Sequence, residues 1–95
     1  MIERHITFNV HPDRTAAFER FFVERYRAAM SASPGFVRAD LLREADSPAR
    51  YQMVLRFVDP DSAAGWRTSP VHEALQPDLK ALFSDNEIQA YEVIA

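Results

Sequence analysis

The sequence has no cysteine, which excludes disulfides, thiol catalysis and thiolate metal sites and is typical of a reducing compartment. It has only two glycines, Gly35 and Gly65, whereas phosphate-binding loops need several glycines where the backbone approaches the anion. Nucleotide-dependent chemistry is therefore disfavoured.

Basic runs and long apolar runs are also missing. With a formal net charge of −3 and no basic cluster, nucleic acid is not an expected partner. No stretch approaches a run of about 18 apolar residues, and the first residues, MIERHITF, do not resemble a signal peptide. We expect a cytoplasmic protein with no membrane partner.

The chain lacks the usual patterns of metal and nucleophile sites. His5, His11 and His72 have none of the spacings of a zinc site, so we expect no metal. No G-x-S-x-G motif occurs, and Ser69, which precedes a proline, has the pattern of a helix cap rather than a nucleophile.

The 95 residues are 47% hydrophobic, which predicts one globular domain spanning 1–95. Ile6, Phe8 and Val10 alternate with polar residues, as in a strand with one packed face. Strands are predicted at 2–10, 36–44, 50–58 and 87–95, a long helix at 13–31, and further helical segments from 60 and from 70. The order β-α-β-β-α-β predicts an α+β, ferredoxin-like fold, with a four-stranded antiparallel sheet and helices on one face.

Caps and breaks set the expected helix boundaries. Asp59 followed by Pro60 is a strong helix entry, and Ser69 followed by Pro70 repeats the signature. Pro77 should break or kink the second of these helices, with a further turn over 78–83.

One sheet face is left uncovered by this arrangement. It should carry apolar residues, namely Val37, Leu41, Val54 and Val93 or their alternates. A small domain buries only roughly 60–70% of its unfolded surface, so a second copy stacked sheet on sheet is the economical cover. We expect a homodimer.

Aromatic residues make up 12% of the chain and allow two interpretations. Phe18, Phe21, Phe22 and Tyr26 on the long helix can face Phe8, Met53, Leu55 and Phe57 on the sheet. They then form a core, or they wall an apolar pocket for a flat organic ligand, or both.

The stretch 66-WRTSPVHEALQ-76 holds the only tryptophan. With Ser69 as cap, His72 falls in the first turn of a helix, where the positive end of the dipole favours the neutral imidazole. A neutral imidazole beside an apolar cavity is a candidate base for a phenolic substrate. A surface histidine with no role is the alternative.

The pattern W-x-x-S-P-x-H-x-x-x-Q, formed here by Trp66, Ser69, Pro70, His72 and Gln76, resembles the antibiotic biosynthesis monooxygenase family. Three further segments share the likeness, which covers nearly the whole chain: 34-PGF-36, 57-FVDPDSAAGW-66 and 91-YEV-93.

The resemblance implies a dimeric α/β barrel of two ferredoxin-like subunits, with a pocket between sheet and helices. It implies a monooxygenase that needs no metal or flavin and oxidises a small phenol or quinol with O₂. By the same resemblance His72 would assist proton transfer, Trp66 would stack on the substrate, and Phe22, Tyr26 and Met53 would line the cavity.

Two alternatives remain at this stage. A dimeric small-molecule-binding or accessory protein of the same fold would need fewer cooperating polar groups. Haem degradation is disfavoured, because that branch of the family pairs Trp66 with a strand asparagine and a later histidine, where this chain has Ile6 and Gln76.

Overall fold

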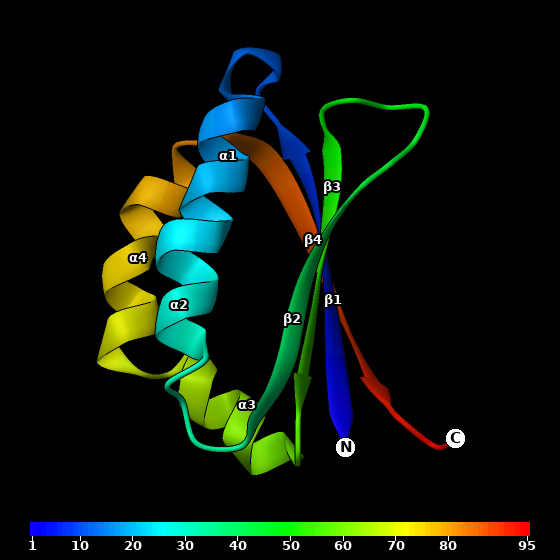
Figure 1. Ribbon diagram of the computed structural model, residues 1–95, viewed down its shortest axis with the longest axis vertical. Helices are drawn as coiled ribbons and strands as arrows, with labels where there is room; N and C mark the ends of the chain where they lie inside the picture. The colour runs from blue at the N-terminus through cyan, green and yellow to red at the C-terminus, as the bar shows by residue number, and fades with distance from the viewer.

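The computed structural model describes residues 1–95 as a layer of helices on one face of an antiparallel sheet (Figure 1). The four strands lie in the order β2-β3-β1-β4. Their bounds are β1 Ile2–Val10, β2 Phe36–Arg43, β3 Arg50–Phe57 and β4 Phe83–Glu92. The predicted βαββαβ order and ferredoxin-like α+β fold are confirmed.

Strand β1 is central, and its alternation sets the two faces of the sheet. Ile6, Phe8 and Val10 are buried on the helix side, as the pattern predicts. Ile6 is paired with Met53 of β3 and with Ile88 of β4. Even-numbered residues of β1 therefore face the helices.

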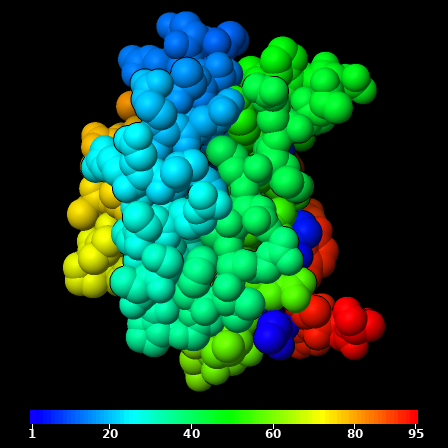
Figure 2. All heavy atoms as spheres, in the orientation of Figure 1, coloured from blue at the N-terminus to red at the C-terminus, as the bar shows by residue number.

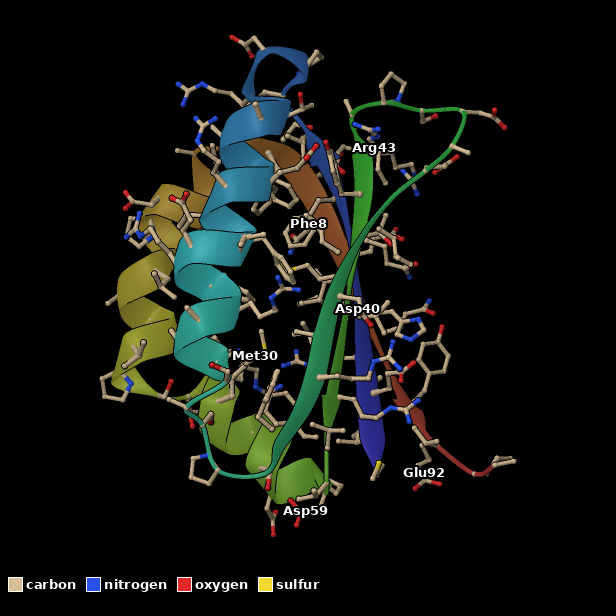
Figure 3. The ribbon with its side chains drawn as sticks, viewed as in Figure 1. Phe8, Met30, Asp40, Arg43, Asp59 and Glu92 are labelled. Carbon is tan, nitrogen blue, oxygen red and sulfur yellow. The ribbon has the colours of Figure 1, made fainter.

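The long predicted helix forms as one helical stretch with a wider turn inside it. It comprises η1 (Pro12–Arg14), α1 (Thr15–Phe21), the π-helical η2 (Phe22–Tyr26) and α2 (Arg27–Met30). Phe18 and Met30 are fully buried, and Figure 3 shows Met30 and Phe8 between the helices and the sheet. None of the helices is both long and apolar enough to cross a membrane.

Helices α3 (Pro60–Arg67) and α4 (Pro70–Lys80) begin where the capping signals predict. The Asp59 carboxylate accepts from the Ser62 N–H at 2.8 Å. The predicted break at Pro77 is wrong, because α4 continues through it to Lys80. The lost backbone hydrogen bond is tolerated because Leu75 and Leu79, on either side of Pro77, are buried in the core.

The last strand also differs from its prediction. It begins at Phe83 rather than at residue 87, and ends at Glu92. Pairing with β1 sets this start, since Phe83 lies opposite Val10 across a bulge at Asn9. The segment 78–83 is therefore the end of α4, a short turn and the first residue of β4.

The uncovered sheet face is more polar than predicted. Leu41 does not lie on it, because a bulge between Phe36 and Arg38 shifts the alternation, and Leu41 packs against the core opposite Met53. Ion pairs cross the open face, including Arg56 with Glu3 at 2.6 Å.

Two segments project from the body of the molecule. Figure 2 shows the loop between β2 and β3, and the last residues after β4, extending away from it. The loop lies at the end of the sheet next to Arg43, which is labelled in Figure 3.

The turn before β2 requires glycine. Gly35 has φ +78°, and a Cβ there would lie 2.4 Å from the Cβ of Ser62. Gly35→Ala should therefore lower the free energy of unfolding by about 2 kcal/mol in urea denaturation. Gly65→Ala is the matched control, because no atom lies within 4 Å of its added Cβ. In the helix that change should stabilise by up to about 1 kcal/mol, so an equal loss in both variants contradicts the prediction.

Candidate functional site

His72 stands in the first turn of α4, held there by its cap. Its backbone N–H donates to Ser69 Oγ at 3.2 Å. The ring is half-buried and lies against two aromatic rings, with its centroid 5.2 Å from Trp66 and 6.2 Å from Tyr26. Trp66 and Tyr26 meet edge to face at 5.6 Å. We call Tyr26, Trp66 and His72 the aromatic triad.

A cavity of about 350 Å³ lies between α4, β1 and β4, and we call it the sheet-side cavity. His72 and Tyr26 line it. Its other lining residues are Arg4, Ile6, Phe8, Arg67, Gln76, Leu79, Lys80, Phe83, Ser84, Asn86 and Ile88. The cavity therefore combines an apolar wall with a few polar and basic groups.

Trp66 borders a different hollow. The helix-side cavity, of about 560 Å³, lies between the end of α2, α3 and the start of α4, and Trp66 is part of its wall. Trp66 is 2% exposed, and its indole N–H is buried with no hydrogen-bond partner. The triad therefore connects the two cavities, with His72 on one and Trp66 on the other.

Phe22 and Met53, which the resemblance assigns to the cavity wall, have other positions. Both are buried in the core, with 1% and 0% of their surface exposed. Phe22 stacks on Tyr26 at a centroid distance of 6.4 Å, and Met53 lies on β3 opposite Ile6. Neither is among the residues that line the sheet-side cavity.

The surroundings of His72 favour its neutral form. Burial lowers the pKa of His72, and the positive charge of Arg4 adds to the effect. The direction agrees with the sequence-based expectation, although burial rather than the helix dipole is the leading cause. The Gln76 amide nitrogen lies 3.2 Å from His72 Nε2. An amide nitrogen can only donate, so this pairing suits a neutral ring whose Nε2 accepts.

Tyr26 is almost completely buried, and burial raises the pKa of its phenol. Trp66 and Arg4 act in the opposite direction more weakly. The Trp66 N–H does not reach hydrogen-bond geometry with any acceptor. Tyr26 therefore stays protonated at neutral pH and lines the cavity as a neutral group.

Sequence reasoning missed Arg4 and Arg67. Arg4 is half-buried on the helix side of β1, where it interrupts the apolar row of Ile2, Ile6, Phe8 and Val10. That interruption is visible in the sequence and could have identified it. Arg67, at the end of α3, carries no comparable signal.

No group of three or more His, Cys, Asp or Glu side chains lies close enough together to hold a metal ion.

Comparison with known proteins identifies relatives of the whole chain. The family model for "Antibiotic biosynthesis monooxygenase" matches residues 1–78. The crystal structure of SnoaB, a cofactor-independent oxygenase from Streptomyces nogalater, is 29% identical, with a TM-score of 0.88 over 99% of this chain and 93% of that one.

Two more distant structures share the fold. A protein of Deinococcus radiodurans has a TM-score of 0.89 at 18% identity, over 100% of this chain and 94% of that one. One of Nitrosomonas europaea has a TM-score of 0.87 at 19% identity, over 100% of both chains. Comparison with curated proteins gave no match. Because the family model matches most of this chain, the chain belongs to the antibiotic biosynthesis monooxygenase family.

Proposed function

We propose that this protein is a cofactor-independent monooxygenase that oxidises a small aromatic phenol or quinol with O₂ in the sheet-side cavity. The observation that carries the proposal is the position of His72. It is a half-buried imidazole with a lowered pKa that lines an apolar-walled cavity and touches Trp66 and Tyr26. The likeness to SnoaB supports the same reaction class.

His72 acts as the base in this proposal. The substrate hydroxyl replaces the Gln76 amide at Nε2 of His72 and gives up its proton there. The resulting anion is electron-rich enough to reduce O₂ without a cofactor. For a substrate that reacts as a phenol with a ring C–H para to its hydroxyl, as the phenol tautomer of an anthrone does, one oxygen atom ends in a new carbonyl at that carbon. The other leaves as water with the hydrogen of that carbon and the proton taken up by His72, so no external reductant is needed.

The rest of the triad supports the anion and keeps water away. Tyr26 stays protonated and offers a neutral phenol on the cavity wall. Trp66 does not line the sheet-side cavity, and it supports the site by packing its ring against that of His72. Burial of both rings keeps this end of the cavity apolar.

A homodimer belongs to the same proposal, formed by the open sheet faces of two copies. Val37 and Leu42 of β2 and Tyr91 of β4 are large hydrophobic residues with 37%, 50% and 45% of their surface exposed in the single chain. A two-fold contact would cover them. Equilibrium sedimentation should give the mass of two chains, and a stable monomer at micromolar concentration would contradict this part.

Oxygen uptake tests the catalytic proposal. Protein freed of metal by a chelator should consume O₂ with an anthrone or a naphthoquinol above the rate of autoxidation. Haem should not be degraded, because this chain has Ile6 and Gln76 where the resemblance to the haem-degrading branch of the family would call for an asparagine and a histidine. Tight binding of these phenols without oxygen uptake would support the alternative, a binding or accessory protein of the same fold.

A further inference from the structure

We propose that the substrate carries a carboxylate as well as its phenol, and that Arg4 and Arg67 bind this carboxylate in the sheet-side cavity. The inference rests on the proposed function for the location of the site. It adds the charge and chemical class of the ligand.

The cavity is positively charged in an acidic protein. Arg4, Arg67 and Lys80 all line it, and none of its lining residues is an aspartate or glutamate. The whole chain has a net charge of −3, so the cavity has the opposite sign to the protein. A concentration of one charge in a concave site attracts ligands of the other sign.

Arg4 is unusual among the arginines of this chain. Five others pair with a carboxylate: Arg25, Arg38, Arg43, Arg50 and Arg56. Arg27 lies over the Phe22 ring and donates to the Ala39 carbonyl. Arg4 is half-buried, yet it takes part in none of the chain's ion pairs or side-chain hydrogen bonds.

An unpaired, half-buried guanidinium is costly, and its neighbour increases the cost. Burial lowers the pKa of Arg4, and the positive charge of Arg67 lowers it further. An anion between them would offset both effects, because it supplies the missing acceptor and separates two like charges. The pair is therefore a prepared anion site.

The shape of the site favours a carboxylate on an aromatic ring. A guanidinium presents a planar fork of donors that matches the two oxygens of a carboxylate. Phe8, Phe83 and Leu79 supply an apolar wall for the ring. A phosphate cradle would need backbone N–H groups in a glycine-rich loop, and no glycine lines this cavity.

Binding can be measured without turnover by tryptophan fluorescence. Trp66 is the only tryptophan, and its ring packs against His72, which lines the sheet-side cavity. Titrations followed by quenching of its fluorescence should give a dissociation constant for 1-hydroxy-2-naphthoate at least about tenfold lower than that for 1-naphthol, which lacks the carboxylate. Raising NaCl from about 0.05 to 0.5 M should weaken binding of the naphthoate and leave that of the naphthol unchanged.

Arg4→Gln should reduce the affinity for the naphthoate about tenfold and leave that for the naphthol within about twofold. Arg67→Gln should have a smaller effect, because Arg67 is exposed and its charge is screened. Arg20→Gln is the matched control: Arg20 is exposed on α1, lies outside the cavity, and its loss changes the net charge equally. If Arg4→Gln fails to fold, Arg4→Lys retains the charge without the fork and should still weaken naphthoate binding.

Equal affinity of the two ligands, or an equal loss in Arg20→Gln, would overturn the carboxylate assignment and leave the oxygenase proposal intact. Conversely, tight and arginine-dependent naphthoate binding in a protein that consumes no O₂ with any phenol would support this inference and contradict only the catalytic one.

Discussion

Trp66→Ala should lower the free energy of unfolding by about 3–5 kcal/mol, because it removes a large buried ring from the junction of α3, α4 and η2. For a domain of this size the whole stability is about 5–15 kcal/mol, so the melting temperature should fall by on the order of 20 °C. Thermal unfolding followed by circular dichroism measures the effect. A loss below about 1 kcal/mol would contradict a packing role.

Trp66→Phe separates packing from chemistry. It retains most of the apolar surface and removes the indole N–H, which has no partner in the protein. Because no acceptor is left unsatisfied, we expect a stability loss of only about 1–2 kcal/mol. Because Trp66 does not line the sheet-side cavity, kcat should stay within about threefold of the wild-type value, and a fall of about tenfold or more would instead show that the N–H donates to the substrate. Unchanged kcat in a folded Trp66→Phe variant would leave Trp66 as a structural residue only.

His72→Ala should reduce kcat/KM for an oxidisable phenol by about 10²-fold if the ring is a general base. Its stability should fall by no more than about 1 kcal/mol, since the ring is only half-buried. His11→Ala is the control, because His11 precedes η1 and lies outside both cavities. Equal activity of the two variants would remove His72 from the mechanism.

The pH dependence follows from the lowered pKa of His72. Four neighbouring groups bear on it. The charge of Arg4 lowers this pKa, a hydrogen bond to the Arg67 backbone raises it while the Arg67 charge lowers it, Glu73 raises it, and Tyr26 is neutral. Activity should therefore persist as the pH falls through 6.5, the ordinary value, and decline only below it. Arg4→Gln removes a positive charge, so it should move this decline upward towards 6.5. A decline that starts above 6.5 in the wild type would contradict the assignment.

The free energy of unfolding should depend on pH in the same direction as the activity, falling as the pH falls below 6.5. Above pH 6.5 His72 is neutral in both the folded and the unfolded chain and contributes no pH dependence. Below 6.5 the unfolded chain binds the proton first, so this group makes the fold less stable as the pH falls to its folded pKa. His72→Ala should remove that part of the acid sensitivity.

Local patterns allowed much of the fold to be predicted. Alternation in β1, the caps at Asp59 and Ser69, and the turn at Gly35 each depend on neighbours within a few residues. The placement of His72 in the first turn of a helix followed from the same short-range signals, whereas its lowered pKa is caused mainly by burial in the packed structure.

Long-range pairing decided what the sequence by itself did not determine. A bulge in β2 placed Leu41 on the core side of the sheet. Pairing with β1 made β4 begin at Phe83, earlier than predicted. Both depend on the register with a partner strand that is distant in the sequence. Burial of Leu75 and Leu79 kept α4 intact across Pro77, because packing can outweigh one missing hydrogen bond. Only the packed structure showed that Trp66 and His72 face different cavities and that Arg4 lies unpaired beside His72. A cavity is the space that several elements together leave unfilled, so no single segment encodes it.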